Sequence, residues 1–160
     1  MSVAAKALEQ FQARVGTAEP PGEYLRVEQA AIDAFADVTH DHQFIHVDSE
    51  RARRESPFGT TIAHGFLSLS LIPHLLKSVP RPAPDPYAGA ALVLNYGCDR
   101  LRFPSAVKVG SRIRARRQLM SAEQKDANSI QLKHAITVEI EGEEKPACAA
   151  EWLTRVIYPG

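Results

Sequence analysis

The densest group of polar side chains lies at residues 39–48, where the sequence reads Thr-His-Asp-His-Gln-Phe-Ile-His-Val-Asp. Three of the six histidines of the chain stand there beside two aspartates. Near pH 7 an unperturbed aspartate is ionised and an unperturbed histidine is mostly neutral. An aspartate and a histidine of this segment together could therefore hold a water molecule and take its proton. The segment is a candidate acid–base site.

Two other interpretations of residues 39–48 stay open. The first is a solvated polar loop without chemistry. The second is a metal site, because imidazole and carboxylate groups are common metal ligands, although the spacing matches no firm ligand signature such as His-Glu-x-x-His. The possible ligands are His40, Asp41, His42, His46 and Asp48.

A second polar group, Thr-Thr-Ile-Ala-His-Gly-Phe at residues 60–66, precedes the longest apolar segment. The first N–H groups of a helix have no internal acceptor and lie at the positive end of the helix dipole. Gly65 has no Cβ, so a ligand oxygen can approach its N–H closely, as an oxyanion site requires. The alternative is that Gly65 only allows another element to pack closely.

The spacing of apolar residues predicts the elements that position these groups. Residues 79–90 hold four prolines and are expected to form a loop, as are residues 39–47. Pro73 should kink or shorten the helix that contains it. The predicted helices cover residues 2–15, 28–38, 49–55 and 62–79.

Apolar and polar residues alternate to varying degrees after residue 90, which indicates β-strands. The order of helices followed by strands favours an α+β fold with an antiparallel sheet. The apolar helix at 62–79 can be buried only if that sheet wraps around it. The predicted strands cover residues 91–96, 100–103, 111–120, 130–140 and 147–158.

The composition fits one globular domain of 160 residues, with 44% hydrophobic and 24% charged residues. The formal net charge is zero, so the composition gives no electrostatic indication that the protein binds nucleic acid or an anionic membrane surface. No apolar run reaches the roughly 18 residues of a membrane span, and residues 1–16 lack the apolar core of a secretory signal. Two cysteines in no metal or disulfide pattern favour the reducing cytoplasm.

Two motifs carry a resemblance to a known family. They are Phe-Ala-Asp-Val-Thr-His-Asp-His-Gln-Phe-Ile-His-Val-Asp at 35–48 and Ser-Pro-Phe-Gly-Thr-Thr-Ile-Ala-His-Gly-Phe at 56–66. With Leu-Asn-Tyr-Gly at 94–97 and Arg-Phe-Pro at 102–104, the chain resembles the MaoC-like dehydratase family over residues 22–157. Within that family it looks like the NodN-type branch of single-domain (R)-specific enoyl-thioester hydratases.

The resemblance implies a hot-dog fold, in which a long central helix is wrapped by an antiparallel sheet. The whole of residues 1–160 would form one such domain, with a helical extension at 1–21. It also implies a homodimer that needs no cofactor and acts on a coenzyme A or acyl-carrier thioester. The implied reaction is the reversible hydration of a trans-2-enoyl thioester to an (R)-3-hydroxyacyl thioester.

The resemblance also assigns roles to residues. Asp41 and His46 match the catalytic pair of the family, and Gly65 matches the residue whose N–H binds the thioester carbonyl. Three further residues are candidates for contacts with the substrate or with the catalytic pair. These three are Gln43, His64 and Tyr96. The structural alternative for His64 is hydrogen bonding at the helix start, and for Tyr96 it is a core or edge position.

The chain departs from the family pattern Gly-Asp-x-Asn-Pro-x-His at several positions. His40 replaces the glycine, and Gln43-Phe44 replaces Asn-Pro, which fits the NodN-type branch. Pro73 stands where some hydratases of the family carry a serine. A Cβ at position 40 predicts either a different backbone angle beside Asp41 or a shifted carboxylate pKa.

Three other functions therefore remain open. A thioesterase could use the same fold, and His40 beside Asp41 keeps open a binding module without catalysis. A metal protein is the third. His42, His74 and His134 have no predicted role beyond a solvated or structural one.

Overall fold

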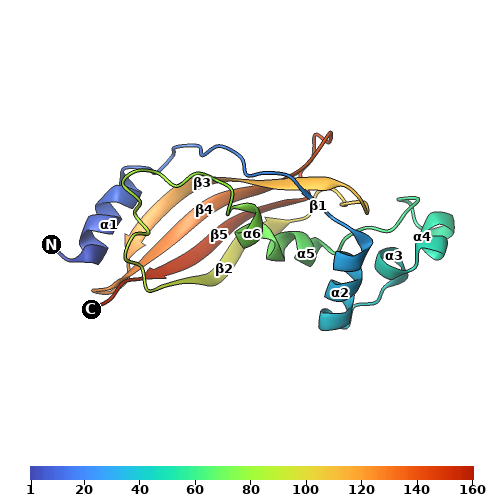
Figure 1. The fold of residues 1–160 in the computed structure, drawn as a ribbon, viewed down its shortest axis with the longest axis horizontal. Helices are drawn as coiled ribbons and strands as arrows, with labels where there is room; N and C mark the ends of the chain where they lie inside the picture. Colours follow the sequence, from blue (N-terminus) through green and yellow to red (C-terminus); the bar gives the residue numbers. More distant parts are fainter.

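A curled five-stranded antiparallel sheet forms the body of the protein in the computed structural model, which describes all 160 residues (Figure 1). The strands are ordered β1-β3-β4-β5-β2, so that sequence neighbours β3, β4 and β5 form a meander and β2 returns to the far edge. The strand bounds are Leu25–Arg26 (β1), Leu92–Arg102 (β2), Arg112–Gln124 (β3), Ser129–Ile140 (β4) and Cys148–Ile157 (β5).

The helices form three groups along the sheet (Figure 1). α1 lies at one end near both termini, α5 and α6 cross the middle of the sheet, and α2, α3 and α4 gather beyond the other end. No helix is long and apolar enough to cross a membrane. The helix bounds are Val3–Gln12 (α1), Gln29–Thr39 (α2), Phe44–Val47 (α3), Ser49–Glu55 (α4), Gly65–Ser70 (α5) and Ile72–Leu75 (α6).

The long helix expected at 62–79 is two short helices, and its beginning was predicted too early. Ile62 forms an isolated bridge with Lys108, and the Ala63 N–H donates to the Val107 carbonyl, so this part of the chain is extended. The break between α5 and α6 follows from Pro73, which has no N–H to donate to the preceding turn. A new helix can begin at Ile72 because a proline in the first turn needs no intrahelical acceptor.

Two other boundaries differ from the sequence prediction. The segment 39–47, expected to be a loop, contains the single turn α3. The strands predicted at 91–96 and 100–103 are one strand, β2, with register shifts after Asn95 and Asp99. Such irregularities interrupt the alternation of side chains by which a strand is recognised.

The main core lies between α5, α6 and the concave face of the sheet. Side chains of β3 show why: Ile113 and Ala115 are completely buried, while Arg114 and Arg116 both pair with Glu139 on the opposite face. This alternation was visible in the sequence and places the arginines outside. A second, smaller core forms where α1 packs on β3 and β4 at the other end of the sheet.

His40 ends α2 in the left-handed conformation, with φ 59° and ψ 26°. The N–H groups of His40 and Asp41 both donate to the Ala36 carbonyl. A glycine would adopt the same angles at the end of a helix. His40 therefore holds the left-handed conformation that glycine favours at the end of a helix, with its imidazole exposed to solvent.

The variant His40→Gly should be more stable than the wild type. An L-residue in the left-handed region costs about 1–2 kcal/mol, part of which is offset because glycine makes the unfolded chain more flexible. We expect the free energy of unfolding in urea to rise by roughly 0.5–1 kcal/mol.

The matched control is His74→Gly, because His74 is equally exposed but lies inside α6. There glycine should lower the free energy of unfolding by about 1 kcal/mol. A loss of stability in His40→Gly would contradict the strain argument.

Candidate active site

Three side chains from separate elements meet where α2, α3 and α5 approach one another. Asp41 follows α2, His46 lies in α3, and His64 stands directly before α5. Their oxygen and nitrogen atoms lie within 4.8 Å of one another. Both imidazoles are buried, whereas the side chain of Asp41 is 56% exposed. The two imidazoles of the cluster are thus shielded from solvent, whereas the carboxylate is accessible to it.

The hydrogen bond of His46 decides which of its nitrogens can act as a base. Nδ1 lies 2.7 Å from the Ile62 carbonyl oxygen. A carbonyl can only accept, so Nδ1 carries the proton, and in the neutral ring Nε2 keeps a free lone pair. Burial lowers the pKa of His46, and the nearby His64 adds to this effect, while the bond to Ile62 and the charge of Asp41 oppose it. The imidazole is therefore neutral at pH 7.

His64 holds the segment that carries Asp41. Its Nε2 donates to the backbone carbonyl of Asp41 at 2.9 Å, and the carboxylate Oδ2 lies 3.9 Å away. The ring stacks on His46 with a centroid distance of 3.7 Å and contacts Phe35 at 5.0 Å. The predicted role of hydrogen bonding at the start of its own helix is wrong, because the ring is turned toward Asp41 and makes no cap.

Gly65 packs closely against Phe103 and also leaves its backbone N–H free. A Cβ there would lie 2.8 Å from the ring of Phe103, so close packing requires glycine. At the same time its N–H has no acceptor in the chain. Gly65 and His46 line one cavity of about 340 Å³, together with Ser68 and Phe103. A free donor and a free imidazole lone pair thus belong to the same cavity.

A buried amide network that the sequence analysis missed fixes the backbone of this site. Gln29, in the first turn of α2, donates from Nε2 to the His46 carbonyl at 2.7 Å. Its Oε1 accepts from the Thr61 hydroxyl at 2.6 Å. The sequence could have indicated this role of Gln29 by its spacing. It lies three residues before Ile32 and seven before Ala36, on the buried face of the helix. A polar residue on an apolar face needs such partners.

Gln43 lies beside the cluster but its side chain does not take part in it. Its carbonyl accepts from the His46 N–H at 2.9 Å, and its own N–H is 3.4 Å from the carboxylate of Asp41. The side chain is exposed and makes no hydrogen bond. It is free to meet a ligand.

Tyr96 lies outside the cluster. It belongs to β2, is 60% exposed, and stacks under the Arg155 guanidinium at 4.4 Å. It lines a neighbouring cavity of about 330 Å³ between β2 and the α5–α6 pair, not the one that holds His46 and Gly65.

The structure does not gather the other metal ligands that the sequence suggested. His42 bonds to Asp37 at 2.8 Å, and Asp48 caps α4 by accepting from the Arg51 N–H. His40 is exposed at the end of α2.

The residues that do gather fit a metal ion poorly. Zinc bonds histidine nitrogen at about 2.0–2.1 Å in a tetrahedral arrangement. The rings of His46 and His64 are stacked within 22° of parallel, so their in-plane lone pairs run side by side and do not converge on one point. One nitrogen of each ring is also held by a backbone carbonyl. We derive no chemistry through a metal.

The chain is similar to several known proteins. The MaoC like domain family matches residues 10–141. Nodulation protein N of Rhizobium leguminosarum bv. viciae is 47% identical over 146 residues, covering 91% of this chain and 88% of that protein. The 3-hydroxyacyl-thioester dehydratase Z of Mycobacterium tuberculosis is 44% identical over 135 residues, covering 84% of this chain and 85% of that protein.

Among solved structures, the R-hydratase PhaJ1 of Pseudomonas aeruginosa superposes with a TM-score of 0.66. The sequence identity is 22%, and the match covers 91% of this chain and 83% of that one. This likeness shows the fold: the curled sheet around α5 and α6 is a hot-dog fold, as expected, with its central helix broken in two.

The variant Gln29→Ala should unfold more readily. It leaves the His46 carbonyl and the Thr61 hydroxyl without partners, and each buried unsatisfied group costs about 1–3 kcal/mol. We expect the free energy of unfolding to fall by at least about 1 kcal/mol, and the ¹⁵N resonances of the His46 ring to shift.

The control is Gln12→Ala on the exposed face of α1, which should change stability by less than about 0.5 kcal/mol. Equal effects of the two substitutions would show that the Gln29 network does not hold the site.

Proposed function

The chain belongs to the MaoC-like domain family, and we propose that it adds water reversibly across trans-2-enoyl thioesters to give (R)-3-hydroxyacyl thioesters. The observation that carries this proposal is that the neutral buried imidazole of His46 lines one cavity with the free backbone N–H of Gly65, and that the exposed carboxylate of Asp41 lies within 4.8 Å of the histidine pair. The name of the relative from M. tuberculosis, a 3-hydroxyacyl-thioester dehydratase, supports the same reaction.

Hydration needs a base for water and an acid for the α-carbon. The water oxygen bonds to the β-carbon as the C=C π bond breaks, and a proton reaches the α-carbon. The carboxylate of Asp41 and Nε2 of His46 hold the water and remove its proton, and one of them returns a proton to the α-carbon. A placed acid or base of this kind contributes about 10²–10⁴ in rate.

The thioester oxygen becomes negative in the enolate-like transition state. The N–H of Gly65 would donate to this oxygen, and one such donor contributes about 10²–10³ in rate. His64 acts as a positioning residue, since its ring binds the backbone of Asp41. Gln43, with its free amide beside the carboxylate, would contact the substrate. Tyr96 would line the path of the acyl chain along β2.

Two rival functions remain testable. Fold alone does not separate a hydratase from a thioesterase. The binding module loses its main support, because His40 leaves the backbone beside Asp41 in the angles that glycine would adopt. We place the protein in the cytoplasm on the strength of its two free thiols, Cys98 and Cys148.

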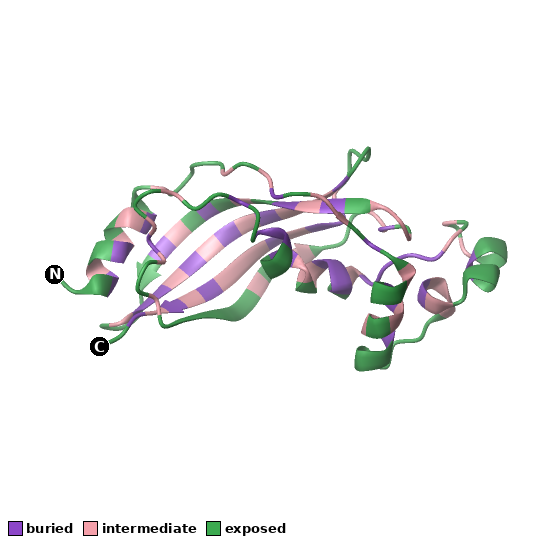
Figure 2. Cartoon of the chain, viewed as in Figure 1, coloured by how far each residue is buried: buried purple, intermediate pink, exposed green.

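A homodimer is part of the proposal, and β2 is its interface. This strand is the long open edge of the sheet, and it is exposed along nearly its whole length (Figure 2). Leu92, Val93, Leu94 and Tyr96 are each 46–60% exposed. Unpaired, apolar edge strands seek a partner strand. A second copy related by a two-fold axis would pair its own β2 with this edge.

Crotonyl-coenzyme A tests the reaction directly. The purified protein should remove the absorbance of the enoyl thioester without releasing free thiol. Asp41→Asn and His46→Gln should each lower kcat/KM by roughly 10²–10⁴-fold, because each removes one member of the acid–base pair. His42→Gln is the control, since His42 bonds to Asp37 outside the cluster and its loss should leave the rate unchanged.

Release of thiol in this assay would make the protein a thioesterase. Failure with crotonyl and longer enoyl chains, combined with tight binding of the thioester, would make it a binding module.

Light scattering during size exclusion should give the mass of a dimer. Leu94→Lys should shift the protein toward the monomer, because it places a charge on the apolar edge of β2. Met120→Lys adds the same charge to an exposed residue of β3, away from that edge, and should remain dimeric. A wild-type monomer at all concentrations would exclude the proposed interface.

A further inference from the structure

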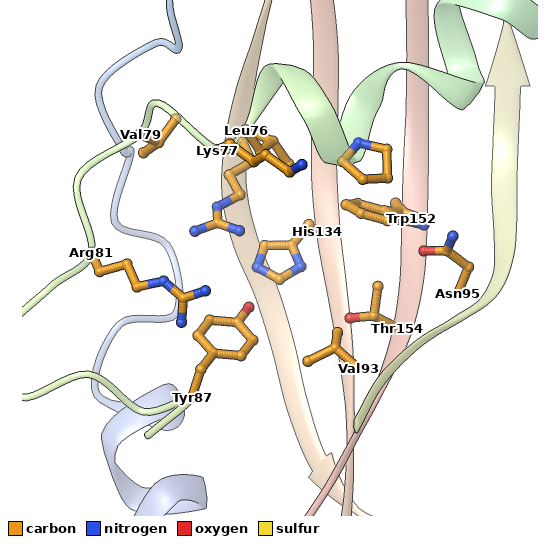
Figure 3. Close-up of a pocket in the computed structure, with 12 residues that line it drawn as sticks. Leu76, Lys77, Val79, Arg81, Tyr87, Val93, Asn95, His134, Trp152 and Thr154 are labelled. Carbon is orange, nitrogen blue, oxygen red and sulfur yellow. The ribbon is translucent and has the colours of Figure 1, made fainter. Parts of the chain in front are cut away.

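A second cavity, of about 410 Å³, lies at the other end of the α5–α6 pair from Gly65 (Figure 3). It is enclosed by α6, the proline-rich loop and the concave face of the sheet. The proposed chemistry uses none of its residues. One of its buried polar atoms has no partner in the chain.

His134 is the clearest case. It lies on β4, is only 4% exposed, and its buried Nδ1 has no hydrogen-bond partner. Burial, assisted by the positive charge of Arg117, lowers the pKa of His134 to about 3, so the ring is neutral at pH 7. A buried polar atom without a partner costs about 1–3 kcal/mol and calls for a ligand or a water molecule.

Two hydroxyl groups near His134 also make no hydrogen bond within the chain, although they are not fully buried as its Nδ1 is. Tyr158 donates to the Pro86 carbonyl, whereas neither Tyr87 nor Thr154 makes a side-chain hydrogen bond within the chain. Figure 3 shows the Tyr87 hydroxyl pointing toward His134. Burial raises the pKa of Tyr87, so its phenol remains a donor at neutral pH.

The charges around the cavity favour an anion. Its lining contains three cationic side chains, Lys77, Arg81 and Arg117, and no carboxylate. Arg117 and Arg81 are paired with Glu19 and Asp85, which lie outside this lining, and Lys77 forms no ion pair. A negative group placed beside His134 would meet a surplus of positive charge and two uncommitted donors.

The rest of the lining is apolar. Leu76, Val79, Val93 and Trp152 form the walls. The fitting ligand is therefore an apolar chain that ends in a carboxylate.

This cavity continues toward the active site. Pro73, Asn95 and Trp152 also line the next cavity along β2, the one that holds Tyr96 and Leu69. At 1.5 Å per helical residue, Gly65 and Leu76 are separated by about 17 Å along α5 and α6. An acyl chain whose thioester binds at Gly65 would run along this helix pair toward Tyr87 and His134.

We propose that the preferred substrates carry a carboxylate at the far end of the acyl chain, and that Tyr87, His134 and Arg117 bind it. The proposal rests on the proposed hydratase function for the position of the thioester. The site itself stands on the cavity, on its unpartnered polar groups and on its cationic lining.

Binding can be measured separately from catalysis. Trp152 is the only tryptophan of the chain and lines the cavity, so its fluorescence reports occupancy. The probes are tetradecanoyl-coenzyme A, whose chain is long enough to cover the distance from Gly65 to Leu76, and its counterpart with a terminal carboxylate. Both are saturated and therefore not hydrated. We expect the dicarboxylic thioester to bind at least tenfold more tightly.

Tyr87→Phe removes only the hydroxyl and keeps the ring, which packs edge-on against Phe11 at 4.9 Å. It should reduce the preference to less than threefold. Tyr24→Phe is the matched control, because Tyr24 lies against Arg112 and Arg114 on the opposite face. It should leave the preference intact. Equal binding of both probes to the wild type would show that water alone fills the cavity and would overturn the proposal.

Hydration assays with trans-2-tetradecenoyl-coenzyme A and its terminal-carboxylate analogue separate the two proposals. A higher kcat/KM for the analogue, lost in Tyr87→Phe, supports both. Hydration of both substrates without preference overturns the carboxylate site and leaves the hydratase function standing. Hydration of neither, with preferential binding that Tyr87→Phe removes, supports the site and overturns the hydratase function.

Discussion

The hydrogen bond from His46 to the Ile62 carbonyl is the interaction on which the active site depends. It joins α3 to the chain that leads into α5, and the Ile62 N–H returns a bond to the Ile45 carbonyl. This pair of bonds fixes the distance between the His46 imidazole, the proposed base, and Gly65. It also fixes the tautomer, because a carbonyl forces Nδ1 to carry the proton and leaves Nε2 free. One contact thus sets both the geometry and the protonation of the base.

The bond matters because the segment that carries the site has little else to hold it. α2, α3 and α4 extend beyond the end of the sheet (Figure 1). The ion pairs of α4, Arg51–Glu55 and Arg53–Glu50, are exposed, and such pairs contribute about 0–1 kcal/mol. The segment is held by a few buried side chains such as Ile32 and Ala52, by Gln29, and by the stacked rings of His46 and His64. Precision here comes from hydrogen bonds to backbone carbonyls more than from apolar packing.

The sequence predicts what depends on local pattern and misses what depends on tertiary partners. The capping of α4 by Asp48 and the outward arginines of β3 follow from spacing alone. The late start of α5 could not be predicted, because it depends on a bridge to Lys108 more than forty residues away. The same holds for the partners of Gln29 and for the turn of His64 toward Asp41. The roles proposed for Asp41, His46 and Gly65 come from the resemblance to a family, which supplies what spacing cannot.

His46 and His134 lie buried at opposite ends of the α5–α6 pair and differ in how their ring nitrogens are bonded. Burial lowers the pKa of His46 and of His134, so both rings are neutral donors and acceptors at pH 7. His46 has its proton committed to a carbonyl and presents one defined lone pair to a cavity, which is what a base needs. His134 has no such commitment, because its buried Nδ1 has no hydrogen-bond partner in the chain. Nδ1 of His64 is also buried without a partner, but only His134 lies beside Tyr87, Thr154 and Arg117 in the lining of the cavity of about 410 Å³. Folding alone fixes the proton of His46, whereas in our proposal a bound ligand completes the hydrogen bonding of His134.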